Sequence, residues 1–142
     1  MKTQSGRSMI EMLGVLAIIG VLSIGGLAGY TRAMNAHQAN QVLDYVNRCS
    51  IAVQERIGVA PGTAINNVNC DTAEYLGTSD TLPGAANNGH AVIAYTANAS
   101  TFTITATLSS SDVAAAARNK GTGQTNPAWS GSNTSVVGTY TL

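Results

Sequence analysis

Apolar residues follow three different patterns along the chain, and each pattern predicts a different element. Residues 12–31 form one run without a charged side chain. Residues 42–57 place apolar side chains at steps of three or four, which indicates an amphipathic helix. Residues 101–108 alternate between Thr and apolar side chains, which predicts a strand with one buried face and one solvated face.

The uncharged run from Met12 to Thr31 is twenty residues long. As a helix it spans about 30 Å, the thickness of a bilayer core. Lys2 and Arg7 precede it. By the positive-inside rule, we expect the N-terminus to stay in the cytoplasm and the rest of the chain to cross the membrane. The alternative is a removed secretory signal, but the run is longer than a usual signal core and Leu27-Ala28-Gly29 is a poor cleavage site.

Five glycines lie in this run: Gly14, Gly20, Gly25, Gly26 and Gly29. Gly25 and Gly29 form a small-xxx-small pair, which lets two membrane helices approach closely. Gly25-Gly26 is also where we expect the helical hydrogen bonding to loosen at the least cost. Ordinary glycine use in membrane helices is the alternative explanation.

No Pro or Gly interrupts residues 31–57, so we expect one helix from about Ser8 to Ile57. A break near Gly29 would instead give two helices. One face of the second half carries the apolar positions, and Asp44 and Arg48 form an i,i+4 pair on the opposite face. The apolar face consists of Val42, Val46, Cys49, Val53 and Ile57.

The rest of the chain predicts a small α+β head. Residues 58–90 read as a loop, with one helical turn started by a capping box from Asp71 to Glu74. Strands are expected at 90–96, 101–108 and 135–142, with a short helix at 111–120 and a loop at 121–133. We therefore expect a long helix packed on a small antiparallel sheet.

The two cysteines, Cys49 and Cys70, can form one disulfide in an oxidising compartment. Because Cys49 lies on the apolar face of the helix, this bridge would staple the loop onto the helix and stabilise the fold by about 3 kcal/mol. Two free buried thiols are the alternative.

Charge and motif content disfavour several functions. Charged residues are only 10% of the 142 residues, and seven basic residues balance seven acidic ones. No basic surplus is present to hold a phosphate backbone, so general nucleic-acid binding is not expected. No nucleophile–base pair, paired carboxylates or phosphate loop appears, so we expect neither an enzyme nor a cofactor. His37 and His90 have no signature spacing, and no metal site is expected.

The residues from Gly6 to Glu11, followed by the apolar run, resemble the N-terminal signature of type IV prepilins, most like a type IVa-style major pilin. In that family a short basic leader ends in Gly, and the fifth mature residue is Glu. Here the leader would be residues 1–6, Arg7 would be the new N-terminus, and Glu11 falls fifth. Arg7 departs from the family, which usually has Phe or Met there.

The resemblance implies a role for each of these residues. A membrane-embedded prepilin peptidase would cut after Gly6 and methylate the new N-terminus at Arg7. Glu11 would pair with the N-terminal ammonium of a neighbouring subunit, because an unpaired carboxylate in the bilayer costs about 2.5–3.5 kcal/mol. Glu11 would also help to neutralise Arg7.

The resemblance also implies an organisation and a set of partners. Residues 7–30 would be the transmembrane and filament-core helix, and residues 31–142 the pilin head, with an amphipathic helix (31–57), a loop (58–90) and a sheet (91–142). The chain would sit in the inner membrane with its head in the periplasm. The pilus assembly machinery would then build it into an extracellular homopolymer that serves adhesion, twitching motility or DNA transfer.

Two other functions remain open at this point. A type II secretion pseudopilin shares the N-terminal signature, but major pseudopilins usually hold calcium through C-terminal carboxylates, and the last acidic residue here is Asp112. A membrane-tethered periplasmic binding domain would need only the anchor, and would leave Gly6 and Glu11 without a role.

Overall fold

A computed structural model describes residues 5–78, 81–86 and 90–142, with side chains from residue 8 onward. The chain divides into two compact units, an N-terminal unit ending at Met34 and a head, Asn35–Leu142. The predicted leader, residues 1–6, lies largely outside the described residues. The fold is α+β, as expected from the sequence.

Helix α1 spans Ser5–Val59 without interruption. The prediction of one helix is confirmed, and the alternative of a break near Gly29 is wrong. Each interior glycine costs about 1 kcal/mol relative to Ala, but it keeps its N–H and does not block the helical bonds as Pro would. The helix therefore continues through Gly25, Gly26 and Gly29.

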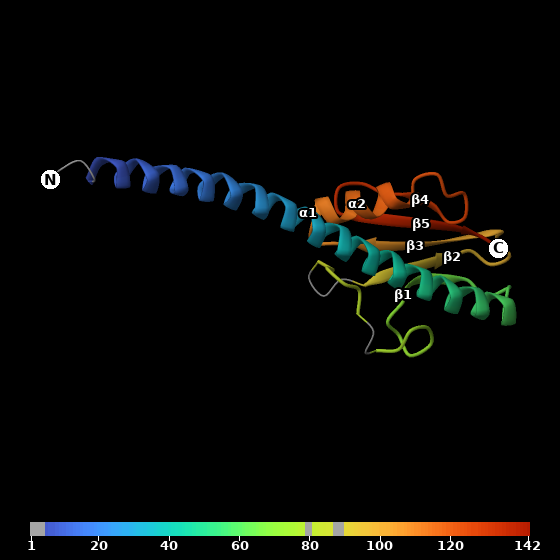
Figure 1. The fold of residues 1–142 in the computed structure, drawn as a ribbon. Helices are drawn as coiled ribbons and strands as arrows, with labels where there is room; N and C mark the ends of the chain where they lie inside the picture. The colour runs from blue at the N-terminus through green and yellow to red at the C-terminus, as the bar shows by residue number, and fades with distance from the viewer. Residues whose placement is uncertain (1–4, 79–80, 87–89) are drawn as a thin grey trace. The chain divides into compact units, whose positions relative to one another are not determined.

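The head contains one antiparallel sheet, whose strands are β1 (Ile65–Asn69), β2 (Ala91–Tyr95), β3 (Thr101–Thr107), β4 (Ala128–Ser130) and β5 (Ser135–Thr141). The five strands lie in the order β1-β2-β3-β5-β4. The central strand β3 pairs with β2 on one side and β5 on the other (Figure 1).

Two edge strands correct the sequence prediction. Residues 65–69 and 128–130 were expected in loops, but they form β1 and β4. Neither segment shows apolar alternation, and β1 also contains a bulge at the left-handed residue Asn67. Each forms because a neighbouring strand offers free backbone groups to pair with, and local sequence does not report that long-range pairing.

The core of the head lies between α1 and the inner face of the sheet. The five predicted apolar residues of α1, from Val42 to Ile57, are at most 5% exposed, which confirms the predicted buried face. From the sheet, Phe102 stacks on Tyr140 with ring centroids 4.9 Å apart, and Ile93 and Ile104 are fully buried.

A second helix, α2 (Ser111–Gly121), confirms the short helix expected at 111–120. The Ser110 side chain accepts a hydrogen bond from the backbone N–H of Val113, as an N-cap does. Gly121 ends the helix against the ring of Trp129, where a Cβ would clash with the indole ring. Figure 1 shows α2 next to β5 and β4.

The predicted helical turn at 71–76 is wrong, because this segment forms turns instead. A capping box needs the side chain at its first position to accept a bond from the helix backbone. The Asp71 carboxylate contacts His90, and the Thr72 hydroxyl donates to the carbonyl of Asn69 at 3.2 Å. Both side chains are therefore engaged outside the helical turn.

Candidate assembly site and the disulfide-closed head

The N-terminal unit presents apolar side chains on every side. Twelve large apolar side chains between Met9 and Leu27 are 53% to 75% exposed. The most apolar window of the helix has a mean hydropathy of 2.2, and none of it is buried. This one helix is long and apolar enough to cross a membrane. A contiguous exposed apolar surface of this kind is typical of a segment that contacts lipid or another protein.

The predicted processing and assembly residues lie at the start of this helix. The backbone of Gly6 and Arg7 belongs to α1, and the Arg7 side chain lies outside the described part of the structure. Glu11 is exposed and stands between Ile10 and Met12, which are 73% and 65% exposed. A carboxylate is thus placed in an otherwise apolar surface. The roles of Gly6, Arg7 and Glu11 remain predictions.

The five glycines of the N-terminal unit have open space at the position of a Cβ, as far as the described residues go. A Cβ built on Gly14, Gly20, Gly25, Gly26 or Gly29 would meet no atom within 4 Å. Their backbone is therefore open to a neighbouring molecule, as the small-xxx-small interpretation requires, and the loosening at Gly25-Gly26 stays a prediction.

Two hydroxyls in the same helix are satisfied by the helix itself. Ser23 donates to the carbonyl of Ile19 at 2.8 Å, and Thr31 donates to that of Ala28 at 3.0 Å. In a bilayer core such internal bonds spare the cost of an unsatisfied polar group. These two side chains are consequently compatible with an apolar environment.

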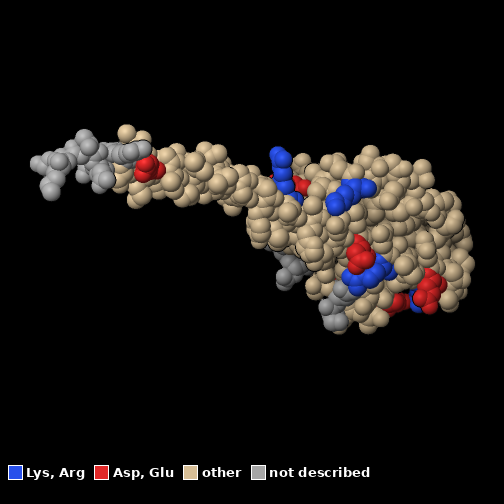
Figure 2. All heavy atoms as spheres, in the orientation of Figure 1, with Lys and Arg blue, Asp and Glu red and all other residues tan. Residues whose placement is uncertain are grey.

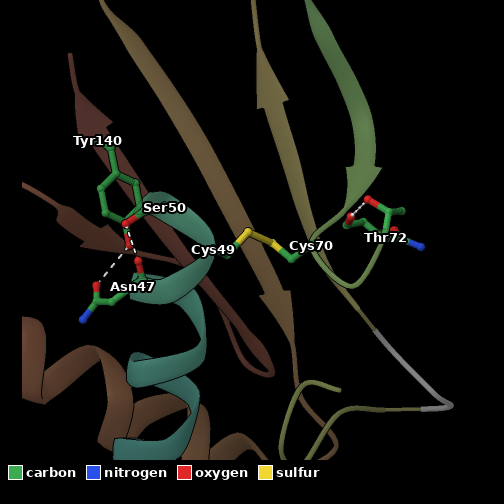
Figure 3. The surroundings of a disulfide bond; sticks show 7 residues. Asn47, Cys49, Ser50, Cys70, Thr72 and Tyr140 are labelled. Atoms are coloured by element: carbon green, nitrogen blue, oxygen red, sulfur yellow. Dashed lines mark hydrogen bonds between the residues drawn. A yellow bond between two sulfur atoms is a disulfide. The ribbon is translucent and has the colours of Figure 1, made fainter. Parts of the chain in front are cut away.

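The predicted bridge between Cys49 and Cys70 is present, with Cα atoms 5.8 Å apart (Figure 3). It joins α1 to the residue that follows β1, and both cysteines are fully buried. A crosslink over a separation of 21 residues stabilises a fold by roughly 3 kcal/mol in the chain-entropy account. The bridge therefore fixes the start of the loop after β1 on the helix.

A contact between an imidazole and a carboxylate lies one position beyond the disulfide. The backbone N–H of Cys70 donates to the carbonyl of Ala91 at 2.8 Å, which extends the β1–β2 ladder. Next along, His90 Nδ1 lies 2.7 Å from Asp71 Oδ2. This pair closes the base of the loop between the two strands. Sequence analysis missed it, because only the register of β1 against β2 brings the two residues together.

Tyr140 connects the sheet to the helix by polar contacts. Its hydroxyl donates to Asn47 Oδ1 at 3.3 Å, and Ser50 donates to the carbonyl of Asn47 at 2.7 Å (Figure 3). Burial raises the pKa of Tyr140 from 10.0 to about 12, although a hydrogen bond with Ser50 opposes part of the rise. The neutral phenol is thus part of the packed core.

The chain matches no protein-family model, no curated protein and no solved structure. A long apolar N-terminal helix followed by a small antiparallel sheet is compatible with a pilin.

Proposed function

We propose that the chain is a structural subunit of a type IV pilus, made as a prepilin, cleaved after Gly6 and polymerised through its N-terminal helix. The observation that carries this proposal is the N-terminal unit, whose apolar side chains are 53% to 75% exposed between Met9 and Leu27. Lipid covers such a surface before assembly, and the same helices of other copies cover it in a filament. A bundle of such helices accounts for a helix that is apolar on all sides.

Glu11 gives the assembly a register. A carboxylate in an apolar environment is costly, and an ammonium group of a neighbouring subunit offsets that cost by several kcal/mol. Cleavage after Gly6 would create a new ammonium group at Arg7, four residues before Glu11. An incoming subunit whose Glu11 meets the ammonium of a neighbour is therefore favoured over one shifted along the filament axis.

The proposal is tested by intact-mass measurement on surface filaments sheared from cells that make the chain. We expect a mature chain beginning at Arg7. Glu11→Gln, which removes the charge and keeps the shape, should reduce the filament yield by about tenfold or more, as expected for the loss of a buried ion pair. Glu55→Gln is the matched control, because Glu55 is an exposed carboxylate of the same helix within the head.

A chain that keeps residues 1–6 and stays in the membrane would contradict the proposal. It would leave a tethered periplasmic domain as the function to pursue. Equal filament yields for Glu11→Gln and Glu55→Gln would remove the assembly role of Glu11 and leave the processing prediction intact.

A further inference from the structure

The contact between Asp71 and His90 joins a mostly buried carboxylate to a partly exposed imidazole. The Asp71 side chain is 14% exposed and the His90 side chain is 38% exposed. His90 Nδ1 lies 2.7 Å from Asp71 Oδ2, whereas the buried Asp71 Oδ1 has no hydrogen-bond partner among the described residues. Burial of a carboxylate costs free energy unless hydrogen bonds or an opposite charge replace its water. The stability of this segment therefore depends on what His90 supplies to Asp71.

Two ion pairs account for most of the other charges on the elements around the disulfide. Within α1, Arg48 Nε lies 3.2 Å from Asp44 Oδ2. Between α1 and the segment after the disulfide, Arg56 Nη2 lies 2.5 Å from Glu74 Oε1. The other titratable side chains of α1 beside the bridge, of that segment and of β2 are Glu55, Tyr75 and Tyr95. Histidine is the side chain whose ordinary pKa lies between pH 5 and 8, so His90 is the group here whose charge we expect to change near neutral pH.

The contact stands at the end of the β1–β2 ladder, directly beyond the disulfide. The backbone N–H of Cys70 donates to the carbonyl of Ala91 at 2.8 Å, and Asp71 and His90 are the next residues on the two sides of the ladder. Cys70 is bonded to Cys49 of α1, and both sulfurs belong to fully buried residues. A ladder that opens from this end must first break the contact between the imidazole and the carboxylate. Reagents in solution reach a buried disulfide only after such a local opening.

We propose that the Asp71–His90 contact is a pH-sensitive link that holds the end of the β1–β2 ladder, and with it the disulfide, more tightly in acid than at neutral pH. A protonated imidazole gives the carboxylate a positive partner, and a charge-assisted hydrogen bond is about twice as strong as a neutral one. In the opened ladder both groups face water, where such a pair is worth little. Because an ordinary imidazole becomes charged below about pH 6.5, the link is tight below about pH 6 and weakens as the pH rises above about 7.

The test measures how fast a phosphine reductant cleaves the disulfide of the full-length chain, held in micelles of an uncharged detergent, at about pH 5.5 and about pH 7.5. Each rate is divided by that of the urea-unfolded chain at the same pH, which removes the pH dependence of the reductant itself. The normalised rate of the wild type should be about fivefold lower in acid. His90→Gln keeps a donor and loses the charge, and Asp71→Asn keeps the shape of the carboxylate. Each should abolish the difference between the two pH values.

His37→Gln is the matched control, because His37 is the second of the two histidines and is exposed on α1. It should keep the difference seen in the wild type. The proposal is overturned if the wild-type rates are equal at the two pH values, if His37→Gln removes the difference, or if Asp71→Asn retains it.

Hydrogen exchange at the Cys70 amide keeps the proposal testable if a variant does not fold, because it needs only the wild type. The protection of this amide, corrected for the intrinsic exchange rate, should be greater at about pH 5.5 than at about pH 7.5. Equal protection would reject the link. The contact lies within the head, so none of these outcomes depends on cleavage after Gly6 or on filament yield, and the link and the proposed function stand or fall separately.

Discussion

The two units of the chain use the same helix in opposite ways. From Met9 to Leu27, large apolar side chains of α1 are 53% to 75% exposed, whereas the five apolar residues of its buried face, between Val42 and Ile57, are at most 5% exposed. Figure 2 shows few charged atoms along the N-terminal unit and several on the visible face of the head. The chain therefore forms a helix both where its apolar side chains are exposed and where they are buried. In the head, the sheet covers the apolar face of the helix, whereas the apolar side chains of the N-terminal unit are not packed within that unit.

The largest expected effect separates the two units. A fragment of residues 35–142 keeps the whole core of the head and should be a folded monomer in buffer, whereas the full-length chain should require detergent. Sedimentation and circular dichroism of both proteins measure the difference. A full-length chain that stays monodisperse in buffer would show that the N-terminal helix finds its cover within the chain.

The disulfide should matter only to the head. Reduction, or the Cys49→Ser Cys70→Ser double substitution, should lower the free energy of unfolding of the 35–142 fragment by roughly 3 kcal/mol. Urea unfolding with and without reductant measures this loss. Partition of the full-length chain into detergent should not change. A reduced head of unchanged stability would mean that the bridge does not restrict the unfolded chain.

A matched pair of substitutions tests the two uses of the helix directly. Val46 is fully buried in the head, and Val21 is 73% exposed in the N-terminal unit. Val46→Ala should cost the head about 2 kcal/mol through lost burial and a cavity, while Val21→Ala should cost it less than about 0.5 kcal/mol. Chemical unfolding of the full-length chain in detergent, monitored at Trp129, compares them. Equal effects would mean that the units do not unfold separately.

A pH effect should also be confined to the head. Burial raises the pKa of Tyr140 to about 12, above the ordinary 10.0 of an unfolded tyrosine. The unfolded chain therefore loses its proton first, and stability that is complete below pH 10 is lost as the pH rises toward 12. The loss should be on the order of 2 kcal/mol. Unfolding of the 35–142 fragment between pH 9 and 12 measures it, and Tyr140→Phe should flatten this part of the profile.

Sequence alone determined the features that depend on near neighbours. The uncharged run, the steps of three and four, and the Thr alternation predicted α1, its buried face and β3, because each pattern repeats the geometry of a single element. The short helix α2 was readable for the same reason, from its acidic start and the glycine at its end. The disulfide was predictable because the chain holds only two cysteines.

Tertiary structure decided what depends on residues far apart in the chain. The strands β1 and β4 exist because β2 and β5 offer them backbone partners, and Asp71 meets His90 only through that pairing. The Asp71–Glu74 capping box was overridden by the same contact. Local patterns specify which face of a helix or strand is apolar. The tertiary structure decides which helices and strands pack together through those faces, because strand pairing and packing act between segments that are distant in the sequence.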